Sequence, residues 1–114
     1  MNFLEIQNCV IAVKKTMKNP RYQADFLRAI CESENFESPK ADIQKRMMEL
    51  FPEKTGYNWA SCPVWKAVLN KRCPTGENLF SFDKKTKIYK MNNDEPITEA
   101  QREKLIGLVG DLLK

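Results

Sequence analysis

The sequence predicts one mainly α domain of the α+β class, a helical bundle with a C-terminal β-hairpin and a closing helix. Apolar residues recur at helical spacing up to Phe51, and proline with capping residues divides that stretch into separate helices. Between Leu79 and Met91 the pattern changes to two short β-rich runs. With 114 residues and 42% hydrophobic content, the chain is long enough for one core and too short for two ordinary domains.

The first helix is predicted from Phe3 to Met17. Asn2 is placed to cap its N-terminus, and Glu5 completes a capping box by reaching back to the backbone of Asn2. Lysines near its other end complement the negative end of the helix dipole. Its predicted inward face consists of Phe3, Ile6, Val10, Val13 and Met17.

The next two helices are predicted from a capping residue followed by proline, which is favoured at the first helical position. Asn19-Pro20 begins a short helix that ends near Cys31, and Ser38-Pro39 begins another that Pro52 stops. The acidic segment 32–37 is predicted as the loop between them. The residues expected to be buried in these helices are Tyr22, Phe26, Leu27, Ile30, Ile43, Met47, Leu50 and Phe51.

A fourth helix is predicted after the loop 53–57, beginning near Asn58 or Ser61 with Pro63 in its first turn. Val64 and Val68 are expected to face inward, with Leu69 as a further candidate, while polar residues cover the other faces.

Two tryptophans flank the start of this helix. Burial of at least one of them is favoured over stacking on a base, and Trp59 is the better core candidate than Trp65.

The predicted hairpin joins Leu79, Phe80 and Phe82 to the run Ile88, Tyr89 and Met91. Its tip reads Asp83-Lys84-Lys85-Thr86-Lys87. Thr98 and Gln101 form a capping box that begins the closing helix, followed by Leu105, Leu108, Val109 and Leu112 at helical spacing. Residues 1–96 are therefore assigned to one domain, and residues 97–114 to a helix that packs on it or mediates a homodimer.

Positive charge is concentrated in one part of the sequence. Residues 54–90 carry a surplus of +6, whereas residues 1–53 are neutral and residues 91–114 carry −2. Such clustering is expected of phosphate contacts, because each neutralised phosphate releases condensed counterions. The competing interpretation is a solvated, lysine-rich hairpin without a partner, since lysines also protect strand edges from aggregation.

A helix with a basic end followed by a ribbon with a basic tip is the order of parts in a winged helix-turn-helix, a module that usually sits on DNA. Lys66 and Asn70 are one turn apart and share a face that can lie in the major groove, although a solvated helix face has the same pattern. The residues predicted to contact double-stranded DNA are Lys66, Asn70, Lys71 and Arg72 of the fourth helix and Lys84, Lys85 and Lys87 of the wing. The alternative is a winged helix that binds an acidic protein instead of DNA.

Little in the sequence indicates an enzyme. The chain has no histidine for a nucleophile pair and only four glycines, with no phosphate-binding loop among them. Asp83-Lys84-Lys85 matches the acid-any-Lys end of the motif in many metal-dependent nucleases. That motif needs a strand within a larger sheet and a second acid upstream, whereas Asp83 is predicted at a turn.

Four widely spaced cysteines would have to converge from separate elements to hold zinc, so reduced structural cysteines are expected. No run approaches the roughly 20 apolar residues of a membrane span. We expect a cytoplasmic protein without catalytic activity, metal, cofactor or membrane contact.

The order of three helices, a basic helix and a hairpin, with the segment Trp65-Lys66-Ala67-Val68-Leu69-Asn70-Lys71 leading into the hairpin, resembles the N-terminal winged-helix domains of Mrr-type and other modification-dependent restriction enzymes. The resemblance covers roughly residues 3–91. It implies a DNA-recognition module of a restriction or other DNA-processing protein, with a nuclease or helicase domain fused beyond Lys114 or supplied separately.

Overall fold

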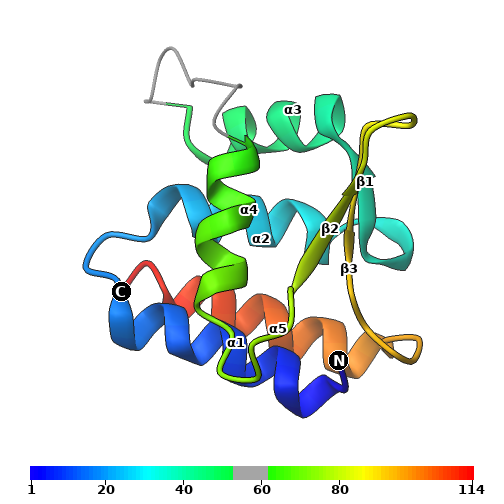
Figure 1. Ribbon diagram of the computed structural model, residues 1–114. Coiled ribbons are helices and arrows are strands. Elements are labelled where there is room, and N and C mark those ends of the chain that lie inside the picture. The colour runs from blue at the N-terminus through cyan, green and yellow to red at the C-terminus, as the bar shows by residue number, and fades with distance from the viewer. Residues whose placement is uncertain (53–61) are drawn as a thin grey trace.

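The computed structural model describes residues 1–52 and 62–114, and within these residues the chain forms five α-helices, one 3-10 turn and three strands (Figure 1). The predicted α+β class is confirmed at this level. The expected loop 53–57, the helix start at Asn58 or Ser61 and the expected burial of Trp59 lie outside the described residues. In chain order the elements are α1 (Phe3–Thr16), α2 (Arg21–Cys31), η1 (Glu34–Phe36), β1 (Glu37–Pro39), α3 (Lys40–Leu50), α4 (Cys62–Lys71), β2 (Phe80–Asp83), β3 (Ile88–Met91) and α5 (Glu99–Asp111).

Both predicted capping boxes are present. The side chain of Asn2 accepts from the N–H of Glu5 at 2.8 Å, and the Glu5 carboxylate accepts from the N–H of Asn2 at 2.9 Å. Thr98 and Gln101 exchange the same pair of bonds at the start of α5. Because each box satisfies two backbone amides within four residues, the sequence alone is enough to place these helix starts.

Helix α2 is the centre of the molecule, since α3, α4, α5 and the sheet all pack against it. Phe26 on this helix meets the rings of Phe80 and Tyr89 edge-on, with centroids 5.5 and 5.3 Å apart. All three residues are almost fully buried. Edge-to-face packing of this kind adds to the area that the rings bury, so these contacts fix the hairpin to the helices.

The predicted start of the third helix at Ser38-Pro39 is wrong, because both residues belong to a strand. β1 pairs antiparallel with β3, which also pairs with β2, so the sheet order is β1-β3-β2. Pro39 has φ −61° and ψ 147° and serves as the N-cap of α3, which begins at Lys40. The residue before a proline is pushed toward extended backbone, and this suits Ser38 to a strand as well as to a helix cap.

The cap predicted at Asn19 is also displaced by one residue. Pro20 occupies the N-cap position of α2, without a side-chain hydrogen bond, and the helix begins at Arg21. Proline lacks a backbone N–H, so no donor is left unpaired at this position.

Helix α5 lies against α1 and α2, where Leu105 and Val109 are buried. Arg102 ties it to the end of α2 by donating to the carbonyl oxygens of Cys31 and Ser33. The closing helix is thus part of the same core. None of the helices in residues 1–52 and 62–114 is long and apolar enough to cross a membrane.

Candidate nucleic-acid interface

The inward face of α4 matches the sequence prediction in part: Leu69 is buried as expected and Val68 is half-buried, but Val64 faces solvent. The buried residues of α4 are Cys62, Trp65 and Leu69, whereas Val64 is 58% exposed. The inward orientation predicted for Val64 is therefore wrong. Seven of the ten residues of α4 are apolar, so apolar side chains lie on every side of the helix and spacing alone left the inward face ambiguous. The large side chain of Trp65 takes the core position.

Trp65 is 6% exposed, and its ring stacks on that of Tyr22 with centroids 5.4 Å apart and planes within 5°. The expected burial of at least one tryptophan is confirmed at this position. The indole is consequently covered by α2 and is not presented for stacking on a base.

Asn70 joins α4 to the hairpin. Its Nδ2 donates to the carbonyl oxygen of Phe80 at 3.2 Å, and its Oδ1 accepts from the N–H of Phe80 at 2.9 Å. β2 is an edge strand, so its outward backbone groups have no strand to pair with, and the Asn70 amide takes the place of one. The Asn70 amide, which was predicted to contact DNA, is thus bonded within the fold.

Lys66 lies on the same flank of α4 as Asn70, because residues four apart share a helix face. α4 and β2 run in opposite directions side by side (Figure 1). The hydrogen bonds of Asn70 with Phe80 hold this flank of α4 against the edge strand β2.

A cleft of about 430 Å³ opens along this flank. Its lining contains two lysines, Lys66 and Lys71, and no Asp or Glu. The full lining is Lys66, Ala67, Asn70, Lys71, Cys73, Gly76 and Asn78. α4 carries no acidic residue either, and Glu77, between the lining residues Gly76 and Asn78, is the one carboxylate next to the lining in sequence. With two lysines against it the cleft keeps a positive surplus, which suits an anion such as a phosphate.

The hairpin tip has a fixed shape. Asp83 Oδ1 accepts from the N–H of Lys85 at 2.8 Å and of Thr86 at 3.4 Å, and the Lys87 N–H donates to the Asp83 carbonyl at 2.7 Å. The Lys87 carbonyl in turn accepts from the N–H of Lys40 at 2.9 Å, which anchors the tip to the start of α3.

The three tip lysines, Lys84, Lys85 and Lys87, are exposed to solvent. Lys87 has φ 58°, in the left-handed region that favours glycine. Lys87 therefore has a backbone conformation that is disfavoured for lysine.

Arg72 lies apart from the tip. Its Nη1 donates to the carbonyl oxygen of Thr16 at 3.4 Å, at the C-terminal end of α1. A cation at this place complements the negative end of the α1 dipole, so Arg72 has a structural role. The structure thus groups Lys66 with Lys71 and the tip lysines with one another, and gives Asn70 and Arg72 partners within the fold.

The contact of Lys40 with the hairpin was not predicted, because the sequence places this residue at the start of a helix far from the hairpin in the chain. Its N–H binds the tip through Lys87, and its ammonium group acts on the thiol of Cys62. Burial raises the pKa of Cys62, and the positive charge of Lys40 opposes this rise. The start of α4 and the tip therefore share this lysine as a neighbour, a proximity that only the pairing of β1 with β3 creates.

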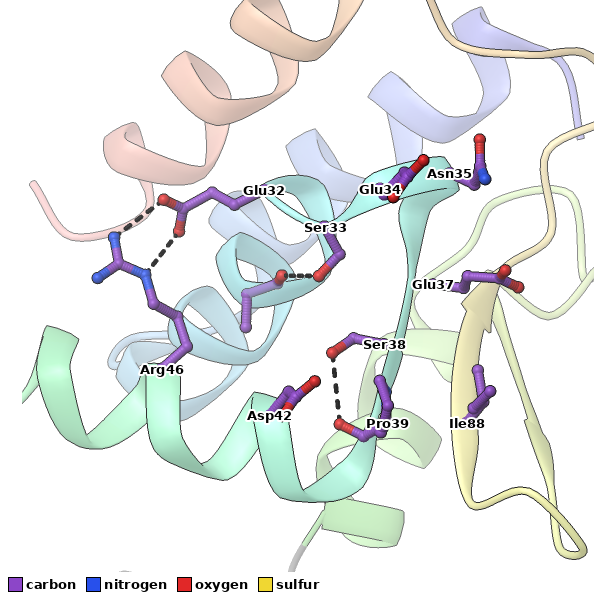
Figure 2. Close-up of a pocket in the computed structure, with 11 residues that line it drawn as sticks. Glu32, Ser33, Glu34, Asn35, Glu37, Ser38, Pro39, Asp42, Arg46 and Ile88 are labelled. Carbon is purple, nitrogen blue, oxygen red and sulfur yellow. Dashed lines mark hydrogen bonds and ion pairs between the residues drawn. The ribbon is translucent and has the colours of Figure 1, made fainter.

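The opposite side of the sheet is acidic. A cleft of about 540 Å³ between α2, β1 and α3 is lined by four carboxylates, Glu32, Glu34, Glu37 and Asp42 (Figure 2). One of them is paired, because Arg46 donates two hydrogen bonds to Glu32 at 3.0 and 2.9 Å. β1 and β2 are the two edge strands, so the acidic cleft, which β1 lines, and α4, which packs against β2, lie at opposite edges of the sheet.

The four cysteines are buried free thiols. Burial raises the pKa of Cys31 to about 12. A hydrogen bond with Cys73, together with burial, raises the pKa of Cys9 well above its usual value. In the described parts of the chain no three Cys, Asp or Glu side chains are arranged to hold a metal ion.

Comparisons of this chain with protein-family models, curated proteins and solved structures gave no match.

Proposed function

We propose that this chain is a winged-helix module that binds double-stranded DNA. In this arrangement α4 faces the major groove and the hairpin tip contacts the neighbouring backbone. The observation that carries the proposal is the basic face, which we define as Lys66 and Lys71 on α4 together with Lys84, Lys85 and Lys87 on the tip. The lining of its cleft contains no Asp or Glu, and four carboxylates line a separate cleft beside α3.

The arrangement suits a duplex for reasons of shape as well as charge. An α-helix fits the major groove of B-DNA, and a projecting ribbon beside it can reach the next phosphates. Asn70 holds α4 and β2 together, and Lys40 holds the tip to α3, so the two contact elements are positioned before binding. Preorganisation of this kind lowers the entropic cost of association.

In this proposal the five lysines bind DNA, and Asn70 and Arg72 stabilise the fold that positions them. Asn70 serves the interface by fixing the hairpin, and Arg72 by fixing the end of α4 against α1. The module itself does not cleave DNA. Magnesium-dependent cleavage of plasmid DNA by the purified chain would contradict this last statement.

The test is fluorescence-anisotropy binding to a labelled duplex across a salt series. If five lysines each neutralise one phosphate, the logarithm of the affinity falls with the logarithm of salt concentration with a slope of about −4.5. The variants Lys66→Glu/Lys71→Glu and Lys84→Glu/Lys85→Glu should each weaken binding strongly and flatten that slope by about 2.

A matched control is Lys104→Glu/Lys114→Glu, which changes the net charge equally but on and after α5. It should bind nearly as well as the unmodified chain. Equal losses in all three variants would show that net charge and not the basic face governs binding. A folded chain that binds no duplex at low salt would overturn the proposal and leave the acidic protein partner as the alternative.

A further inference from the structure

Two of the four buried cysteines contact one another. Cys9 lies on α1 and is fully buried, and Cys73 follows the end of α4. A hydrogen bond joins their thiols. The segment after α4 lies beside α1 (Figure 1), where Arg72 also donates to the carbonyl oxygen of Thr16. The tertiary fold thus brings together two sulfurs that are far apart in the sequence.

Cys73 differs from Cys9 in its access to solvent. It lines the cleft of about 430 Å³ beside α4 and is 6% exposed, whereas Cys9 is covered completely. Hydrogen peroxide needs little more room than one water molecule, about 30 Å³, so the cleft is wide enough for it. The hydrogen bond from Cys9 lowers the pKa of the Cys73 thiol, and the same bond, together with burial, raises the pKa of Cys9. Cys73 is therefore the thiol of the pair that ionises first and that a reagent reaches first.

The other two cysteines have a different environment. Cys31 and Cys62 are fully buried, and burial raises the pKa of both thiols, that of Cys31 to about 12. Because the thiolate is the reactive form of cysteine, buried thiols with a raised pKa are inert. A thiol that is accessible, readily ionised and next to a second thiol has the properties of an oxidation-sensitive cysteine with its resolving partner.

We propose that Cys73 and Cys9 are a redox-active pair, which a hydroperoxide oxidises to a disulfide between α1 and the end of α4. The Cys73 thiolate attacks one peroxide oxygen and the O–O bond breaks. Cys73 becomes a sulfenic acid, and the leaving hydroxide takes up a proton to give water. The Cys9 sulfur then attacks the Cys73 sulfur, the S–O bond breaks, and the Cys9 proton leaves with the hydroxyl group as a second water. A reducing dithiol reverses the reaction by thiol–disulfide exchange.

The test treats the folded, reduced chain with hydrogen peroxide and counts free thiols after unfolding. The count should fall from four to two and return to four with dithiothreitol. Trypsin places the four cysteines on separate peptides, since Lys or Arg lies between each and the next, so mass spectrometry identifies the linked pair. The peptides of Cys9 and Cys73 should be joined. The disulfide should raise the thermal midpoint of unfolding by roughly 10 °C, because it closes a long loop in the unfolded chain.

Single substitutions separate the two roles. Cys73→Ser keeps a donor for the Leu69 carbonyl oxygen, which the Cys73 sulfur contacts at 3.7 Å, and should leave the remaining thiols unreactive in the folded chain. Cys9→Ala should still react at Cys73 but stop at the sulfenic acid, which dimedone traps. Cys31→Ala and Cys62→Ala are the controls and should form the disulfide as the unmodified chain does. Circular dichroism of each reduced variant checks that it is folded before oxidation.

Three outcomes would overturn this inference. One is four intact thiols at a peroxide concentration that oxidises free cysteine. Another is a linked pair that includes Cys31 or Cys62. The third is a link between Cys9 and Cys73 that forms only when the oxidation is carried out in urea, because the folded structure would then play no part. Thiol oxidation is measured without DNA, so these outcomes leave the proposed function standing.

Discussion

Replacing Asn70 by alanine tests whether this residue supports the fold or reads DNA. The substitution removes two hydrogen bonds to the backbone of Phe80, each contributing about 1 kcal/mol. It also leaves the N–H of Phe80, a residue 1% exposed, without its acceptor, and such an orphaned donor adds about 1–3 kcal/mol. We therefore expect the free energy of unfolding to fall by about 3–5 kcal/mol and the melting temperature by roughly 15 °C.

The measurement is circular-dichroism thermal melting combined with urea unfolding. Asn70→Asp keeps an acceptor for the Phe80 N–H but sets a carboxylate oxygen against the Phe80 carbonyl, so it should also be destabilised. Lys71→Ala, at an exposed position on the same helix, is the matched control and should stay within about 0.5 kcal/mol.

The result that would refute this reasoning is an Asn70→Ala variant of unchanged stability that loses affinity for DNA. In that case the amide would act mainly on a ligand, and its bonds to Phe80 would contribute little to the folded state. A variant that is destabilised but still binds DNA when folded would support the structural role.

Three further predictions concern residues outside α4. Lys87→Gly should raise the free energy of unfolding by up to about 1–2 kcal/mol in urea titrations, because a φ of 58° is favourable for glycine and disfavoured for lysine. The same substitution should weaken DNA binding. A loss of stability would contradict the view that the Lys87 backbone is strained. Burial raises the pKa of Tyr89 to about 12, so the folded state holds this proton more tightly than the unfolded state, and stability should fall as pH rises from 10 toward 12. Tyr89→Phe should show a flatter pH dependence in the same range and lose the phenol that titrates near pH 12 in an ultraviolet absorbance titration. Arg102→Ala should lower the free energy of unfolding by about 2–3 kcal/mol, because it leaves the carbonyls of Cys31 and Ser33 without their donor and uncovers the ring of Phe36. Arg102→Lys should restore only part of the lost stability in the same melts.

The features that could be predicted from the sequence are those whose cause lies within a few residues. The two capping boxes and the turn at Asp83 satisfy backbone groups locally, and the structure has them where the sequence indicated. The strand β1 could not be predicted in this way. It has three residues, one of them proline, and its strand character comes from β3, far along the chain.

The same distinction between local and distant causes applies to the residues of the candidate site. Exposure of the tip lysines was predictable, because a hairpin tip has no neighbours in sequence that could cover it. The bonding of Asn70 to Phe80 and the exposure of Val64 could not be predicted. Helical spacing gives the relative positions of side chains on α4, but which side turns inward depends on Tyr22 and Phe80, which belong to other elements.

The pairing of β1 with β3 determines the order in which this chain can fold. The hairpin of β2 and β3 closes a short loop, whereas the pairing of β1 with β3 closes a long loop that contains α3, α4 and β2. Contacts between segments so distant in sequence form late, because the entropy of closing a long loop must be overcome first. The bond from the Lys40 N–H to the Lys87 carbonyl belongs to this late set. An incompletely folded chain therefore carries the same lysines without their fixed geometry, and the shape of the tip becomes a property of the finished fold.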